Sequence, residues 1–555
     1  MKPELAARGE AAKPAGWWTS RASPGWPALA LALLLAAQFT MVFTRAVNWD
    51  EFWFYYHVDE FAKGRLAEPL QSLHVRLFAW LPALSGSSVT KVVIARLSMF
   101  ACELATLAAI YRIARRFAPQ AEALICALLY VSAGYVLQHG FSFRTDPMIT
   151  AALMWSMAIL VKERLGWWQL GAAAFLLAIA LMISIKIVLY LPAFAGIAWL
   201  RWREDGGGWR VPVSLAAMLI ATLAFAYGIY LWHSQALSGE ATPAGMAGSA
   251  ARWMFFLGVP PYWAMIVKSA MFSPILLILA IMTPFLLFRS QRPTRERIAL
   301  AGLWVIVLTP AFYTNTAGYF YVFMLAPVAA GCALAVCRAT QRYHAMGVSI
   351  AILAVGMGIF ALEDRSTIAR QYALVDVMER TFPEGTAYFD HNGMVPHLQK
   401  ANYLMTPSAV SNYRTSGRNS FREAMEQRPV PVVLGNWPHI IDTLEGKDDT
   451  LLLPGDLAAW RENYIAFWGP IFIAGKLLDA GETRDDEEFL VPGRYSVLDA
   501  PVVMDGRAFQ PGDVLQIERG FHDLHAPRGA ARLQWGERLA PPVEDYKDEP
   551  IYVGF

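Results

Sequence analysis

The chain has 555 residues, of which 56% are hydrophobic and 17% charged, and its formal net charge is +2. Its mean hydropathy is +0.35. These values are too apolar for an ordinary soluble enzyme of this length, and they indicate a polytopic α-helical membrane protein. No nucleic-acid partner is expected of such a chain.

Apolar segments recur along the chain up to about residue 363. A helix needs roughly 20 mainly apolar residues to cross the hydrocarbon core of a bilayer. We therefore predict about eleven transmembrane helices, near 27–44, 92–111, 121–138, 147–161, 167–184, 186–200, 211–233, 264–288, 298–314, 319–337 and 346–362. A different division at 161–167 and 184–187 would change this count without moving the main loops.

Basic residues are concentrated in alternate connections between these segments, and the positive-inside rule places such connections in the cytoplasm. The basic connections contain Arg112, Arg115, Arg116, Lys162, Arg164, Arg201, Arg203, Arg210, Arg289, Arg292, Arg295, Arg297, Arg338 and Arg342. We therefore expect a multi-pass protein of the cytoplasmic (inner) membrane, with residues 1–26 in the cytoplasm and an odd number of spans. Everything after 363 then lies on the extracytoplasmic, or periplasmic, side.

The composition changes at about residue 364. From there on, 29 Asp and Glu residues stand against 19 Lys and Arg, whereas the preceding part of the chain is net positive. We expect a transmembrane catalytic domain over 27–363 and an extracytoplasmic soluble domain over 364–555. Within the latter, 364–487 mixes helix and strand signals, and 488–555 is β-rich, with short strands between Gly and Pro turns that favour a small β-sandwich.

Ionisable residues recur at the outer face of the predicted membrane domain. Asp50 and Glu51 follow the first span in NWDEFWFYYH (48–57), Arg144 and Asp146 lie in the short turn FRTDP (143–147), and Lys186 begins the sixth span. Alone, each has an ordinary interpretation as a solvated acid or a snorkelling base. Together they predict a site, because an ion at the centre of a membrane helix costs about 2.5–3.5 kcal/mol on the insertion scale.

Acids and cations at one membrane face suit a transfer between a lipid held in the bilayer and a reactant that arrives from outside. A carboxylate can accept a proton from an attacking hydroxyl or amine. Cations such as Lys186 and Arg144 would stabilise a departing phosphate.

Four motifs in order carry a family resemblance: NWDEFWFYYH after the first span, FRTDPMITAALMW at the fourth, SIKIVLYLP at the sixth and GYFYVFMLAPVAA at the tenth. Together they resemble the membrane glycosyltransferases of the C superfamily (GT-C), especially the protein O-mannosyltransferase and lipid A aminoarabinose-transferase-like group. The resemblance covers roughly residues 25–340. It does not extend to the soluble domain.

The resemblance implies a polyprenyl-phosphate-linked sugar as donor, used outside the cytoplasmic membrane by a hexosyl- or pentosyltransferase that inverts the anomeric carbon in a single displacement. It maps the catalytic base onto Asp50, with Glu51 beside it, and a supporting acid onto Asp146. It places Lys186 at the donor phosphate, and Tyr319 and Tyr321 at the aromatic positions that precede the tenth span.

Two further groups of residues are candidates for binding. The sequence leaves open whether a divalent metal ion is bound. The candidate ligands are Glu68, His57, His74 and His233, whose spacing forms no metal motif. Arg252 lies in the outer loop 234–263, which either closes over the site or serves as a plain linker, and its side chain could approach a lipid phosphate.

Other functions remain open at this stage. A transporter or flippase of a lipid-linked saccharide would also need acids and cations in a polar cavity, although matched halves or broken spans are expected there. A non-catalytic membrane assembly protein would account for the soluble domain. If the chain is a transferase, its partners are the donor, the membrane lipids and an acceptor that is a lipid, a polysaccharide or a protein.

Overall fold

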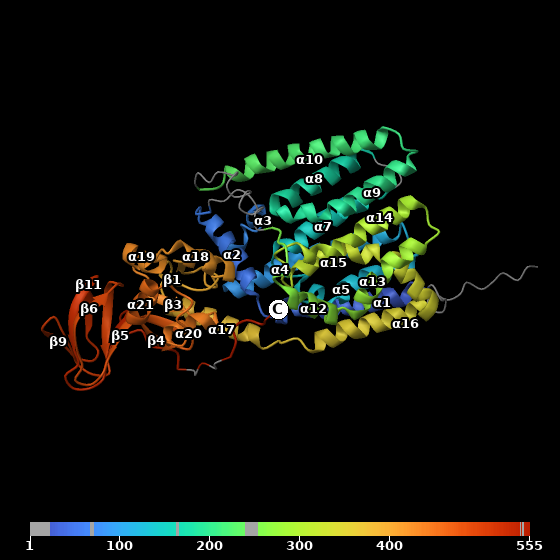
Figure 1. The fold of residues 1–555 in the computed structure, drawn as a ribbon. Helices are drawn as coiled ribbons and strands as arrows, with labels where there is room; N and C mark the ends of the chain where they lie inside the picture. Colours follow the sequence, from blue (N-terminus) through green and yellow to red (C-terminus); the bar gives the residue numbers. More distant parts are fainter. Residues whose placement is uncertain are drawn as a thin grey trace, which may run out of the picture.

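The computed structural model describes residues 23–66, 72–162, 166–238, 254–543, 546 and 549–554. Figure 1 shows two parts, with long helices that run roughly side by side at the right and the C-terminal helices and sheets at the left. The first part holds the apolar segments, and the second holds the acidic C-terminal residues.

The first part consists of helices. They are α1 (Gly25–Thr44), α2 (Trp49–Ala62), α3 (Leu73–Leu77), η1 (Leu81–Ala83), α4 (Ser88–Ala114), α5 (Gln120–Ser132), α6 (Gly134–His139), α7 (Thr145–Leu160), α8 (Trp167–Ile183), η2 (Ile185–Tyr190), α9 (Leu191–Glu204), α10 (Arg210–Ser234), α12 (Trp263–Phe272), α13 (Pro274–Arg289), α14 (Thr294–Trp304), η3 (Val305–Ala311), α15 (Phe320–Gly331) and α16 (Ala333–Ala361).

Each of the eleven predicted apolar segments contains helix, but several of these helices are short or broken. Within the described ranges, five helices are long and apolar enough to cross a membrane, or six if α12 and α13, which meet at a bend of 100°, form one span. Four more apolar helices (α5, α7, α8 and α15) have 10–17 residues. Helix α16 is kinked at His344, whose φ of 63° is not helical. The count of about eleven spans therefore stays a prediction.

Small residues allow close helix packing in this part. Helices α9 and α14 approach each other at Gly196 and Gly302, and a methyl group added at Gly302 would lie 2.5 Å from the carbonyl oxygen of Pro192. Close backbone approach at Gly is typical of helix pairs in membranes, where lipid offers no hydrophobic drive for association. This packing holds the helical part together on the side of α9.

The second part contains five helices and all twelve described strands. Its helices are α17 (Thr367–Thr381), α18 (Pro407–Ser416), α19 (Ser420–Gln427), α20 (Pro438–Leu444) and α21 (Pro454–Asn463). Its strands are β1 (Ala387–Phe389), β2 (Gln399–Lys400), β3 (Val432–Leu434), β4 (Tyr464–Trp468), β5 (Ile471–Leu478), β6 (Thr483–Phe489), β7 (Gly493–Leu498), β8 (Val502–Met504), β9 (Arg507–Phe509), β10 (Val514–Ile517), β11 (Gly520–His525) and β12 (Ala531–Trp535).

The strands form two sheets. One has eight strands in the order β10-β7-β12-β5-β3-β1-β2, with β4 also paired to β5, and the other has four in the order β6-β11-β8-β9. Strands β1, β2 and β3 are parallel, and β3 pairs with β5 in the antiparallel sense. Both sheets contribute side chains to one core, including Val497, Leu533, Val502 and Leu524. The C-terminal part thus contains sheets, whereas the small β-sandwich over 488–555 stays a prediction.

We expect the sequence to change from mixed helix and strand signals to β-rich at residue 488. This position does not divide the two sheets from each other. The strand-rich region already begins at Tyr464 with β4, and β12 pairs with β5 from Ala531↔Leu478 to Gln534↔Gly475. The reason is that the antiparallel partner of β5 comes from the C-terminal end of the chain, a long-range pairing that local composition does not reveal.

The segment that follows α1 and the C-terminal part, which we predict to be a soluble extracytoplasmic domain and call the soluble domain, share a core. Side chains of α2 and the start of α4, such as Phe52 and Val92, pack in one cluster with Leu374, Met394 and Ile471 of the soluble domain. The soluble domain is thus docked on the loop that carries Asp50. In Figure 1 the soluble domain lies beside α2.

Candidate active site

Four of the predicted site residues form one chain of ion pairs. Arg144 pairs with Asp50 and, through Nε at 3.4 Å, with Asp146, and Asp146 also pairs with Lys186. The side chain of Asp146 is 1% exposed, whereas that of Asp50 is 18% exposed. Of the two carboxylates in this series of ion pairs, Asp50 is therefore easier for an incoming molecule to reach than Asp146.

Three elements that are distant in sequence position these groups. Asp50 lies in the first turn of α2, which Asn48 caps by accepting a hydrogen bond from the Asp50 backbone N–H at 3.0 Å. Asp146 lies in the first turn of α7, where a carboxylate is favoured by the helix dipole. Lys186 is held in the 3-10 helix η2 by Ser184, whose hydroxyl accepts from its backbone N–H.

A small cavity opens beside the two cations. It has a volume of about 320 Å³, and Arg144, Lys186, Phe54, Tyr313 and Asn315 are among the residues that line it. Its walls thus combine two positive groups with aromatic rings. Such a cavity can accept an anionic group next to an apolar chain or ring.

The two predicted tyrosines lie differently. The ring of Tyr319 stacks under the Arg144 guanidinium, with 3.3 Å from Cζ to the ring centroid, and its hydroxyl donates to Asn315 at 2.9 Å. Tyr321 is buried with its ring 5.1 Å from that of Tyr135. Tyr319 is therefore part of the ion cluster, whereas the ring of Tyr321 contacts Tyr135 of α6 and Phe320 of its own helix.

Glu51 has a different environment from that of Asp50. Its carboxylate accepts two hydrogen bonds from Arg96, from Nε at 2.8 Å and from Nη2 at 2.6 Å, and two more from the backbone N–H groups of Asn48 and Phe143. Both side chains of the Glu51–Arg96 pair are 1% exposed. We therefore place Glu51 among the residues that hold the loop rather than among those that meet substrate.

The metal candidates do not converge in the described part of the chain. His57 bonds the Trp53 carbonyl through Nδ1, His74 packs against Phe54, and His233 bonds Ser72. Among the residues that the structure describes, no three His, Cys, Asp or Glu side chains are placed to hold one metal ion. Glu68 and Arg252 lie outside the described residues.

Sequence reasoning missed Arg96. It is fully buried and, besides Glu51, it donates to the carbonyl oxygens of Val42, Arg45 and Ala46 at 3.2, 2.8 and 2.8 Å. A signal was available, because an arginine inside an apolar span is rare and usually marks a partner or a pathway. Arg96 ties the end of α1 to the start of α2 and so fixes the segment that carries Asp50.

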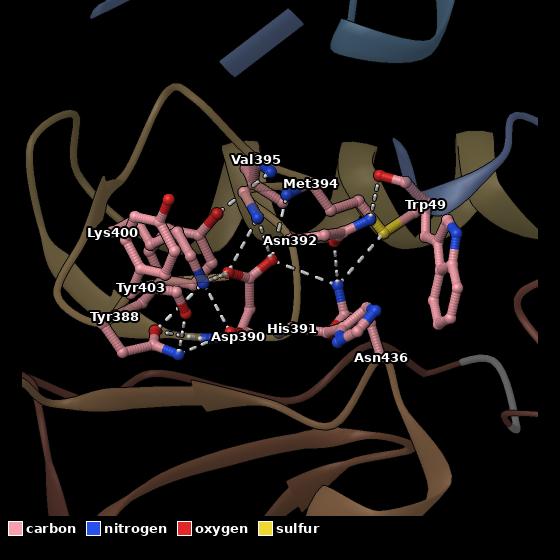
Figure 2. Close-up of polar contacts among 12 residues, drawn as sticks. Trp49, Tyr388, Asp390, His391, Asn392, Met394, Val395, Lys400, Tyr403 and Asn436 are labelled. Atoms are coloured by element: carbon pink, nitrogen blue, oxygen red, sulfur yellow. Dashed lines mark hydrogen bonds and ion pairs between the residues drawn. The ribbon is translucent and has the colours of Figure 1, made fainter. Parts of the chain in front are cut away.

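A second buried ion pair, also missed, lies in the soluble domain (Figure 2). Lys400 Nζ donates to Asp390 Oδ1 at 2.5 Å, and neither side chain is exposed. The backbone N–H groups of Gly393 and Met394 also donate to the Asp390 carboxylate, and Asn436 donates to its Oδ2 at 3.1 Å. This network orders the turn that follows β1.

The network reaches the first turn of α2 through amides. Asn436 donates to Asn392 Oδ1 at 2.9 Å, and Asn392 in turn donates to the carbonyl oxygen of Trp49 at 2.8 Å. Trp49 directly precedes Asp50. The soluble domain therefore holds the backbone next to the ion cluster by a direct hydrogen bond.

Comparisons with known proteins agree with this architecture. No family model matches the chain. Over 145 residues it is 28% identical to the dolichyl pyrophosphate Glc1Man9GlcNAc2 alpha-1,3-glucosyltransferase of Arabidopsis thaliana, a match that spans 25% of this chain and only 27% of that relative.

Solved structures resemble a larger share of the chain. The Archaeoglobus fulgidus oligosaccharyltransferase tethered with an acceptor peptide aligns with a TM-score of 0.52 at 9% identity, over 96% of this chain and 98% of that one. ArnT from Cupriavidus metallidurans in the apo state aligns with a TM-score of 0.50 at 14% identity, over 76% and 95%. The fold is shared across both the helical part and the soluble domain.

Proposed function

We propose that this chain, which has the fold of the GT-C membrane glycosyltransferases, transfers a sugar from a polyprenyl-phosphate-linked donor to an acceptor on the outer face of the cytoplasmic membrane. The observation that carries the proposal is the chain of ion pairs from Asp50 through Arg144 and Asp146 to Lys186, beside a cavity lined by both cations. It supplies a reachable carboxylate and a phosphate-binding pair within one site.

The reaction that fits is a single displacement with inversion. The acceptor oxygen or nitrogen attacks the anomeric carbon from the face opposite the phosphate, and its proton passes to the Asp50 carboxylate. The bond from the anomeric carbon to the phosphate oxygen breaks, and its electron pair leaves with the polyprenyl phosphate. Arg144 and Lys186 stabilise the charge that develops on that leaving group.

Without the donor, the cations of the cluster are paired with its carboxylates. A donor phosphate competes with Asp50 for Arg144 and with Asp146 for Lys186, and guanidinium groups bind phosphate well through paired N–H groups. Once Arg144 turns to the phosphate, Asp50 is released to accept a proton. In this proposal the base becomes available when the donor is in place.

The test compares lipid extracts and membrane protein levels from cells that carry wild type, Asp50→Asn or Asp146→Asn. Loss of a general base typically lowers turnover by about 10²–10⁴-fold, so we expect a polyprenyl-phosphate sugar to accumulate in Asp50→Asn while the protein remains in the membrane. The mass of that lipid identifies the sugar as a hexose or a pentose. Glu60→Gln is the matched control, because Glu60 lies on the same helix and pairs with Arg65 near the surface.

The same experiment separates the alternatives. An unchanged lipid pool in Asp50→Asn, with normal protein level, would count against the transferase and favour a role in transport or assembly. Transfer by purified protein to an added acceptor, lost in Asp50→Asn and kept in Glu60→Gln, would exclude a flippase as the primary activity.

A further inference from the structure

A cleft lies where the soluble domain meets the first turn of α2. Its volume is about 1020 Å³, about three times that of the cavity beside Arg144, and Asn48 and Trp49 of the loop form part of its wall. The opposite wall comes from the soluble domain, including Asn436, Trp437 and Trp468. The cleft therefore opens on the same turn of helix that carries Asp50.

Half-buried aromatic rings line this cleft. The rings of Trp49 and Trp437 both contact the buried His391, with centroids 4.8 and 5.0 Å from that of the imidazole. Trp468 is also half-buried in the lining. Indole rings offer large flat apolar faces at little entropic cost, and the C–H face of a sugar ring can stack on such a face.

Polar groups complete the lining, and they include both acceptors and donors of hydrogen bonds. Asp442, Glu445 and Glu549 line the cleft, against Lys447 as the one cation among the lining residues. Lys447 pairs with Glu445 at 2.5 Å, and Glu549 pairs with Arg370 at 2.5 Å, so Asp442 supplies the remaining negative charge of the lining. A net negative charge at Asp442 disfavours phosphates and uronic acids beside it, and the carboxylate oxygens can accept hydrogen bonds from hydroxyl or ammonium groups.

The walls are fixed before any ligand binds. The buried Asp390–Lys400 pair and the Asn436 and Asn392 amides hold the turn below Trp437 and the carbonyl of Trp49 (Figure 2). Proline residues at 438 and 470 stiffen the rim. A rigid cleft loses little entropy on binding, which favours a ligand such as a saccharide that forms few strong contacts.

We propose that this cleft binds a neutral or amino-bearing saccharide, and that this saccharide is part of the acceptor of the transfer. The second clause rests on the proposed function, whereas binding itself does not. A chain seated on Trp49, Trp437 and Trp468 would present its end to the turn that carries Asp50. A lipid tail is disfavoured, because the cleft combines three carboxylates with amides and belongs largely to the soluble domain.

The test uses full-length protein in detergent micelles on a printed array of neutral, amino-bearing and acidic oligosaccharides, with Ser- and Thr-rich peptides printed beside them. Wild type should bind neutral or amino-bearing saccharides. Trp437→Ala and Trp468→Ala should weaken that binding by roughly tenfold or more, as expected for aromatic anchors in a binding site. Asp442→Asn is a milder second variant that removes one carboxylate and keeps the backbone.

Two controls keep the result interpretable. Phe521→Ala removes an exposed ring (64%) from β11 in the four-stranded sheet and should leave binding unchanged. Glu60→Gln, a change on α2 outside the cleft lining, should also leave saccharide binding unchanged. Saccharide binding by wild type without any sugar transfer would defeat the proposed function and leave the cleft assignment standing. Peptide binding in place of saccharide, or saccharide binding that neither tryptophan variant nor Asp442→Asn weakens, would overturn the cleft assignment.

Discussion

Replacing Glu51 with Gln tests whether two adjacent acids have separate roles. The side chain of Glu51 accepts hydrogen bonds from Arg96 at 2.8 and 2.6 Å and from the backbone of Asn48 and Phe143 at 2.9 and 2.7 Å. Gln keeps the shape but turns an NH₂ group toward donors. It also leaves the guanidinium of Arg96, which is 0% exposed, without a counter-charge.

The expected cost follows from that burial. Removing one partner of a buried ion pair costs about 3–5 kcal/mol, because an uncompensated charge stays behind. Arg96 retains its bonds to the carbonyl groups of Val42, Arg45 and Ala46, so we expect a value near the lower limit, about 3 kcal/mol.

The effect depends on pH. Burial alone would raise the pKa of Glu51, but the charge and hydrogen bonds of Arg96 and the backbone bonds from Asn48 and Phe143 outweigh it, so the pKa is lowered. Stability from this carboxylate is therefore fully present above the ordinary carboxyl range and is lost as the pH falls through the lowered value. The difference between wild type and Glu51→Gln should shrink with it.

The assay is thermal unfolding of the purified protein at neutral pH, followed by tryptophan fluorescence, beside turnover with the lipid-linked donor. Glu51→Gln should unfold at a clearly lower temperature, and a second change of Arg96→Met should recover part of the loss. Asp50→Asn should keep its unfolding temperature within a few degrees and lose turnover. If Glu51→Gln unfolds like wild type yet loses turnover, Glu51 acts in catalysis and the reasoning fails.

Variants at three further positions probe the site and the soluble domain. Asp390→Asn leaves Lys400 buried without its partner, so the free energy of unfolding should fall by about 3–5 kcal/mol in thermal or denaturant titrations at pH 7. Tyr319→Leu removes the ring under Arg144 and should raise the donor KM by about 2–30-fold, whereas Tyr319→Phe should change it little. Burial lowers the pKa of His391 to about 3, so wild type should lose stability as the pH falls below about 6.5, where the unfolded histidine gains a proton. His391→Phe should lack that part of the pH dependence, and equal slopes for both proteins would contradict the assignment.

Topology explains why the ion cluster could be anticipated. Asp50 follows the first span, Arg144 and Asp146 occupy a turn at the same predicted face, and Lys186 begins a later span, so counting crossings alone brings them to one side of the membrane. The same reasoning could not predict the individual ion pairs. Which acid meets which cation depends on the first turns of α2 and α7 and on the 3-10 helix η2, whose relative placement only helix packing decides.

In the soluble domain, local sequence patterns predicted the presence of strands but not how the strands pair. Alternating apolar residues and Gly or Pro turns indicated strands near the C-terminus, and strands are there. The eight-stranded sheet nevertheless joins β12 to β5 and β3 to β1 across many residues. Such pairings depend on long-range register. Local sequence therefore predicts neither the shared sheet nor the cleft that it borders.

Asp50 and Glu51 are equivalent by sequence but have different environments in the structure. Both follow the capping Asn48 and both are acids in the first turn of α2. Their environments differ because one helical step rotates a side chain by about 100°. That rotation turns Glu51 toward Arg96, which is 45 positions away, and Asp50 toward Arg144 and the cavity. In the proposed division of roles, Glu51 holds the loop and Asp50 accepts a proton once Arg144 turns to the donor phosphate. This division is set by the partner that distant helices bring to each side chain, and paired substitutions at the two positions test it directly.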